Sequence, residues 1–156
     1  DETVGRGLGG LRWPGRFEVV GERPWVVLDG AHNPAALAAM LEEAALLPAR
    51  RRFLVFGVSA NKDIPAMCAL VGGFDRIFPT RAPNPRAAPV ESLAALLPPE
   101  KTVAVPGGPA EAVKKALSES GPEDLVLVAG SLYVAGEVKA RAAELGLDGS
   151  LETWAP

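Results

Sequence analysis

Residues Trp25-Val26-Val27-Leu28-Asp29-Gly30-Ala31-His32-Asn33-Pro34 predict a β-strand, a sharp turn and the start of a helix. The apolar run ends at a carboxylate, Gly30 frees the backbone for a turn, and Pro34 suits the first turn of a helix. The turn also holds the only histidine of the chain. Ligands bind at the carboxyl ends of strands in open α/β sheets, so Asp29 and His32 are candidate site residues.

The alternation of strand and helix continues along the chain. Strands are expected at 17–20, 25–29, 53–58, 76–79, 102–105 and 125–129, and helices at 34–47, 64–72, 90–97, 109–120 and 132–145. These strands are apolar throughout, which is typical of strands that helices cover on both faces. The sequence therefore predicts a Rossmann-like, doubly wound α/β fold, with a mostly parallel sheet of about six strands and helices on both faces.

The length and charge of the chain limit the classes of partner that it can bind. Its 156 residues suit one well-packed domain, and 16 basic against 19 acidic side chains give a net charge of −3. That balance provides no broad positive surface for nucleic acid or an acidic membrane. No apolar run has the length of a membrane span, the N-terminus lacks the apolar core of a signal peptide, and the single Cys68 fits a reducing compartment. We expect a cytoplasmic, monomeric protein that binds neither nucleic acid nor membrane.

Two further segments flank the turn at 29–34. Trp13-Pro14-Gly15-Arg16 precedes the first expected strand. Alone it favours a turn with a surface arginine, whereas the sharper hypothesis is that the rigid turn holds Arg16 against a phosphate. In Asn61-Lys62-Asp63, Asp63 is a natural N-cap and Lys62 is a candidate for a ligand carboxylate or phosphate.

The last segment, Gly130-Ser131-Leu132-Tyr133, follows an apolar strand and starts a helix. Ser131 either only caps this helix or, with the free backbone N–H groups there, holds an anionic carboxylate. A hydrolase built from His32, Ser131 and Asp29 is disfavoured, because Ser131 lacks the Gly-x-Ser-x-Gly elbow. The sequence also lacks a Gly-x-x-x-x-Gly-Lys-Ser/Thr phosphate loop and a cysteine–histidine metal cluster.

In order and spacing, these segments resemble the C-terminal domain of folylpolyglutamate synthase, a member of the Mur ligase superfamily. Many bacterial members of that family also act as dihydrofolate synthase. The resemblance spans roughly residues 5–145, and Gly-Ser-Leu-Tyr-x-x-Gly-Glu-Val adds to it. Asn61 departs from the family, which usually has aspartate there. The resemblance implies a domain at 13–156, preceded at 1–12 by the remnant of an interdomain linker.

The resemblance implies an ATP-dependent ligase that phosphorylates a folate or dihydropteroate carboxylate, after which the amino group of L-glutamate attacks the acyl phosphate. By the same resemblance, Arg16 and Asp29 contact the nucleotide, and His32 and Asp29 serve catalysis. The resemblance also makes His32, Ser131 and Lys62 candidates for holding glutamate. ATP and Mg²⁺ are bound mainly by a larger N-terminal domain, no metal ligand is expected in this chain, and the isolated chain is expected to be inactive.

Two alternatives remain open. The chain could be the C-terminal domain of another Mur-type ligase, which adds an amino acid to a cell-wall precursor. It could also be a non-catalytic module that binds a nucleotide or an amino acid at the same turns.

Overall fold

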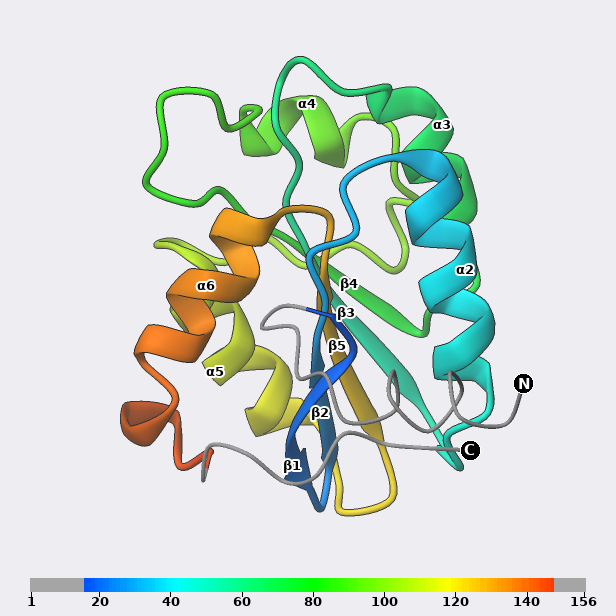
Figure 1. The fold of residues 1–156 in the computed structure, drawn as a ribbon, viewed down its shortest axis with the longest axis vertical. Coiled ribbons are helices and arrows are strands. Elements are labelled where there is room, and N and C mark those ends of the chain that lie inside the picture. The colour runs from blue at the N-terminus through cyan, green and yellow to red at the C-terminus, as the bar shows by residue number, and fades with distance from the viewer. Residues whose placement is uncertain (1–15, 148–156) are drawn as a thin grey trace, which may run out of the picture.

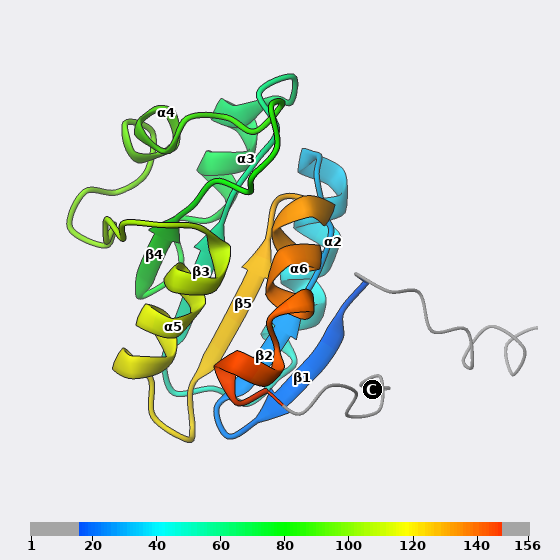
Figure 2. The ribbon, with the colours of Figure 1, turned by 90° about the vertical axis from the view of Figure 1, so that its left-hand side faces the viewer.

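The computed structural model of the chain describes residues 16–147, and a mixed β-sheet runs through their centre (Figure 1). Its strands are β1 (Glu18–Glu22), β2 (Trp25–Leu28), β3 (Arg52–Phe56), β4 (Arg76–Pro79) and β5 (Leu125–Ala129). Their order is β1-β2-β5-β3-β4, and Figure 2 shows the strands next to one another in this order. β1 is antiparallel to β2 and the other neighbours are parallel. The expected Rossmann-like α/β fold with a mostly parallel sheet is confirmed.

The expected sixth strand at 102–105 is wrong for the described residues, whose sheet has five strands. This segment makes only an isolated parallel bridge between Thr102 and Ile77. Val103 donates its N–H to the Ile77 carbonyl at 2.8 Å, and the next step would need an N–H from Pro79. Proline has no N–H, so the pairing cannot extend along β4.

Helices cover both faces of the sheet, as Figure 1 shows. α2 (Pro34–Ala45) and α3 (Ile64–Leu70) lie on one face, and α5 (Pro109–Glu119) and α6 (Leu132–Ala140) lie on the other. The remaining helical elements are the short α4 (Val90–Ala94) and the 3₁₀ turn η1 (Ala143–Leu145). Every residue of β5 is buried, because β5 has a strand on each side and a helical layer over each face.

Three helices that follow parallel strands begin with a side-chain cap. The side chain of Asn33 accepts the N–H of Ala36 at 2.8 Å, and that of Asp63 accepts the N–H of Ala66 at 3.1 Å. Ser131 accepts the N–H of Tyr133 at 3.2 Å. Such caps satisfy N–H groups that have no partner within the helix. The capping roles expected for Asp63 and Ser131 are confirmed, and Asn33 has the same role in α2.

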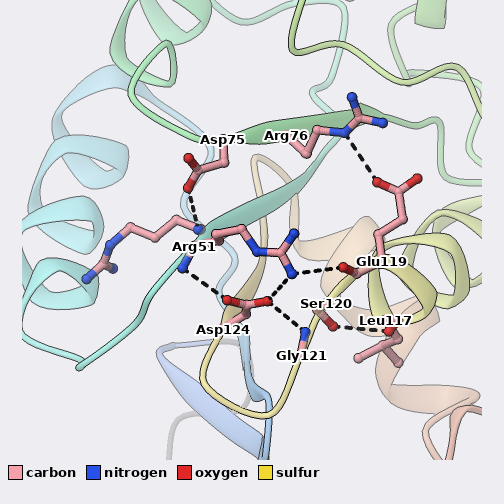
Figure 3. A network of polar contacts seen from close by, with 9 residues as sticks. Arg51, Asp75, Arg76, Leu117, Glu119, Ser120, Gly121 and Asp124 are labelled. Carbon is pink, nitrogen blue, oxygen red and sulfur yellow. Dashed lines mark hydrogen bonds and ion pairs between the residues drawn. The ribbon is translucent and has the colours of Figure 1, made fainter.

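The amino ends of β3 and β5 are joined by a polar network around Asp124 (Figure 3). This buried carboxylate accepts the backbone N–H of Arg51 at 3.0 Å and of Gly121 at 2.7 Å, and it pairs with the Arg51 guanidinium at 2.7 Å. Burial opposes charge on Asp124, but these hydrogen bonds and the cation outweigh it and hold the pKa of the carboxyl below its usual value. The network fixes the edge of the sheet opposite to the capped helix starts.

Candidate functional site

Connections at the carboxyl ends of all four parallel strands converge on one pocket of about 160 Å³. Because β5 lies between β2 and β3, the connection after β5 is flanked by the connections after β2 and β3. The pocket is lined by His32, Ser59, Asn61, Lys62, Arg86, Ser131, Leu132 and Tyr133. The three residues predicted to hold glutamate, which are His32, Lys62 and Ser131, therefore line one pocket.

His32 is half-buried and uses one ring nitrogen within its own turn. Its Nδ1 lies 2.9 Å from the carbonyl oxygen of Gly30. A carbonyl can only accept a hydrogen bond, so this contact assigns the proton to Nδ1 and leaves Nε2 of the neutral ring as an acceptor. The turn thus holds the imidazole in one orientation and leaves its second nitrogen for a ligand.

Ser131 is buried, with 5% of its surface exposed, at a point where two backbones meet closely. The preceding Gly130 has φ +103°, and a Cβ atom there would lie 2.5 Å from the carbonyl oxygen of Gly57. Only glycine fits this combination of positive φ and close approach. Since the Ser131 oxygen accepts the cap bond, its hydroxyl hydrogen stays available to donate to a ligand.

The pocket contains two cationic side chains, Lys62 and Arg86. Lys62 lies in the turn after β3, where its N–H bonds to the Ser59 carbonyl at 3.1 Å. Arg86 donates from Nη2 to the Tyr133 hydroxyl at 3.0 Å, and its guanidinium carbon lies 6.0 Å from the centre of the Tyr133 ring. Tyr133 is 48% exposed, so this pair borders the pocket at the protein surface.

The sequence assigns no site role to Arg86, and it marks Tyr133 only as part of the Gly130-Ser131-Leu132-Tyr133 segment. Arg86 belongs to the proline-rich connection at 80–89, where an exposed linker is the natural prediction. In the structure this connection is bonded to the turn after β3, through the N–H of Ala60 to the Arg86 carbonyl at 2.7 Å and the N–H of Ala88 to the Val58 carbonyl at 2.8 Å. No local sequence signal marks this pairing, which depends on the adjacency of β3 and β4.

The predicted nucleotide residues, Arg16 and Asp29, are not among the residues that line this pocket. Arg16 is exposed, whereas Asp29 is 8% exposed and accepts the N–H of Phe17 at 2.8 Å and the N–H of Ala31 at 2.6 Å. Burial raises the pKa of Asp29, although these two hydrogen bonds and the charge of Arg16 act in the opposite direction. The predicted linker at 1–12 and Trp13-Pro14-Gly15 lie outside the described residues.

Two properties of residues 16–147 concern metal ions and membranes. No group of three or more histidine, cysteine, aspartate or glutamate side chains in this range could hold a metal ion. No helix in it combines the length and apolar character that crossing a membrane requires.

Comparisons with known proteins agree with the resemblance drawn from the sequence. Residues 15–132 match the family described as "Mur ligase, glutamate ligase domain". A probable bifunctional folylpolyglutamate synthase/dihydropteroate synthase from Halobacterium salinarum is 41% identical over 143 residues, which are 90% of this chain and 18% of that protein.

Solved structures agree as well. The bifunctional folylpolyglutamate synthase/dihydrofolate synthase of Yersinia pestis superposes with a TM-score of 0.80 and 30% identity, over 94% of this chain and 34% of that one. A bifunctional folylpolyglutamate synthase/dihydrofolate synthase with Mn, AMPPNP and L-glutamate bound gives a TM-score of 0.78 and 30% identity, over 94% and 35%. The chain thus spans about a third of these structures. By its match over most of its length, the chain belongs to the Mur ligase family and carries the glutamate ligase domain.

Proposed function

We propose that this chain is the glutamate-binding part of an ATP-dependent folylpolyglutamate synthase, which also acts as a dihydrofolate synthase in bifunctional members. The observation that carries the proposal is the convergence of His32, Lys62, Arg86 and Ser131 on one pocket. Its volume lies below the roughly 300–1,000 Å³ of pockets that enclose drug-sized ligands, so it suits an amino acid better than a whole folate.

The charges of the pocket match L-glutamate. The amino acid has two carboxylates, and Lys62 and Arg86 provide one cation for each. Ser131 has a hydroxyl hydrogen left to donate to a carboxylate oxygen. The free Nε2 of His32 can accept a hydrogen bond from the amino group, which orients the nitrogen that must attack. We therefore assign His32 to orientation of the nucleophile.

In the proposed reaction the γ-phosphoryl group of ATP passes to a carboxylate oxygen of the folate or dihydropteroate acceptor, and ADP leaves. The deprotonated amino group of glutamate then attacks the acyl carbon, the C–O bond to phosphate breaks, and an amide and inorganic phosphate result. Shielding the acyl phosphate from water requires closure of a second domain over this pocket. Arg16, just before β1, and Asp29, at the carboxyl end of β2, are proposed to contact the nucleotide.

We propose that the remaining parts of the active site, which bind ATP and Mg²⁺, belong to a longer parent polypeptide. Relatives of the chain have been solved with AMPPNP and Mn, which supports ATP and a divalent metal as requirements of the family. By the resemblance to folylpolyglutamate synthase, we assign Mg²⁺ and most of the ATP site to the rest of the parent. We propose a monomeric, cytoplasmic parent with a linker at 1–12 and with these small molecules, rather than nucleic acid, as its partners.

The test is an acceptor comparison with the complete parent enzyme. We expect phosphate release that depends on ATP, L-glutamate and a folate-type acceptor, and no turnover with a UDP-linked cell-wall precursor. Turnover with the UDP-linked acceptor alone would assign the chain to another Mur-type ligase. A parent that binds L-glutamate or ATP without turning over either acceptor would be the non-catalytic module.

A further inference from the structure

The Asp29 carboxylate joins two segments that meet at the carboxyl end of β2. Its Oδ2 accepts the N–H of Phe17, which enters β1, at 2.8 Å. Its Oδ1 accepts the N–H of Ala31, in the turn before α2, at 2.6 Å. Both oxygens are thus bonded to backbone on opposite sides, inside a buried site where such bonds to a carboxylate are strong.

The Phe17 end of this link is held in an unusual conformation. Phe17 has φ +40°, which is rare for a residue with a side chain and persists only where the surroundings enforce it. Its side chain is 6% exposed and packs in the core on the α2 side of the sheet. The bond to Asp29 and this burial together fix where the chain enters the domain, and hence where the adjacent Arg16 lies.

The Ala31 end leads directly to the glutamate pocket. Ala31 separates Gly30, whose carbonyl accepts from the His32 ring, from His32 itself. The bond to Ala31 therefore stabilises the turn that orients the imidazole. One carboxylate consequently constrains both the residue proposed to meet the nucleotide and the residue proposed to orient glutamate.

We infer that Asp29 is a positioning residue that couples the nucleotide side of the site to the amino-acid side, through Phe17 on one oxygen and Ala31 on the other. This inference rests on the proposed function and adds to a direct contact of Asp29 with the nucleotide. The inference has a distinctive consequence: a substitution of Asp29 should change the KM for glutamate, although Asp29 does not line the pocket proposed to bind glutamate.

The test is Asp29→Asn in the complete parent enzyme, with L-glutamate titrated at saturating ATP and ATP titrated at saturating glutamate. Asparagine replaces one accepting oxygen by an NH₂ group that cannot accept, and it also removes the negative charge. One of the two backbone bonds is therefore lost and the other is weakened, so both sides of the link are affected. We expect the KM values for glutamate and for ATP each to rise by on the order of 10-fold or more. If the KM for ATP rises and the KM for glutamate is unchanged, Asp29 is only a nucleotide ligand and the inference is wrong.

A matched control separates coupling from loss of stability. Asp124 is also a buried aspartate that accepts two backbone N–H groups, but it lies at the opposite edge of the sheet. Asp124→Asn should destabilise the fold while both KM values stay at their wild-type levels. If Asp124→Asn raised both KM values as much as Asp29→Asn does, the effect of Asp29→Asn would come from general destabilisation, and the inference would be wrong.

Asp29→Glu is the second variant, because it keeps the charge but displaces the carboxylate by one methylene group. We expect it to raise both KM values as well, and unchanged KM values in a folded Asp29→Glu enzyme would contradict coupling. A wild-type parent without ATP-dependent glutamate addition would instead refute the proposed function, so the two failures are distinguishable.

Discussion

The two ring nitrogens of His32 have different roles: Nδ1 bonds to the Gly30 carbonyl, and Nε2 is left for a ligand in the pocket. This difference predicts how substitutions of His32 behave. Glutamine places an amide near the position of Nε2, whereas asparagine places one near Nδ1. If His32 orients the amino group of glutamate, His32→Gln keeps most of the activity and His32→Asn loses roughly 10- to 100-fold in kcat/KM for glutamate, the value of one good hydrogen bond to a charged group. Steady-state kinetics of the parent enzyme measure kcat/KM for both variants. If His32→Gln and His32→Asn both lost roughly 10²- to 10⁴-fold in kcat/KM, His32 would act as a general base instead.

Ser131 caps α6 and Asn33 caps α2, but the two residues differ in their relation to the pocket. Both side chains accept one backbone N–H, and only Ser131 lines the pocket. Replacing either by alanine should lower the free energy of unfolding by about 1 kcal/mol, the usual value of an N-cap. Ser131→Ala alone should also raise the KM for glutamate. If both variants left the KM for glutamate unchanged, Ser131 would be a cap and nothing more.

At the scale of elements, the crossing of Gly130 and Gly57 sets how closely the connections after β5 and β3 approach. In Gly130→Ala the new Cβ would meet the Gly57 carbonyl at 2.5 Å from a backbone with φ +103°. We expect a loss of at least about 2 kcal/mol in the free energy of unfolding, which combines the cost of left-handed backbone with a clash. Urea denaturation measures this loss.

Gly136 provides the matched control within α6. A Cβ there meets nothing within 4 Å, so Gly136→Ala should stabilise the protein by about 0.5–1 kcal/mol through helix propensity. A Gly130→Ala protein as stable as the wild type would show that the close approach is not required.

Elements of this fold were predictable where local chemistry determines them. The apolar run of β5, the Asp63 and Ser131 caps and Pro34 at the start of α2 are each local signals, and the structure confirms all of them. The order of strands was not predictable in this way. It follows from which apolar faces pack together, and it is what places Ser131 between His32 and Lys62.

Two particular residues explain the remaining differences from the sequence-based expectations. Pro79 reads as an acceptable end of a strand, yet its missing N–H stops 102–105 from joining the sheet. Arg86 lies in a connection with no periodicity, and only its pairing with the turn after β3 brings it to the pocket. Both effects depend on contacts between segments distant in sequence.

At the scale of the whole molecule, the Asp124 network makes stability depend on pH. The pKa of Asp124 is lowered in the folded state, so the stability that it contributes is present above the pKa of the unfolded chain and is lost as pH falls through the folded value. Asp124→Asn should therefore destabilise by about 2 kcal/mol near neutral pH. The difference from the wild type should shrink in acid, and urea denaturation at several pH values checks this. A difference that stays constant or grows in acid would contradict the assignment.

The isolated 156-residue chain should not turn over. Its sequence has no phosphate loop, and residues 16–147 contain no group of three or more histidine, cysteine, aspartate or glutamate side chains that could hold a metal ion. We expect purified chain to release no phosphate from ATP with glutamate and a folate acceptor, whereas the parent does so under the same conditions. Detectable ligation by the chain alone would show that it contains a complete active site.

The most direct measurement of the central claim, that this domain supplies the amino-acid pocket, is the KM for L-glutamate of the parent enzyme carrying Arg86→Ala. Its control is Arg81→Ala. Arg81 is an exposed arginine of the same connection, but it lines a different groove and does not line the pocket that contains Arg86. We predict that Arg86→Ala raises the KM for glutamate on the order of 10- to 100-fold with the KM for ATP unchanged, and that Arg81→Ala changes neither. An Arg86→Ala enzyme with the wild-type KM for glutamate, or equal effects of the two substitutions, would contradict the account.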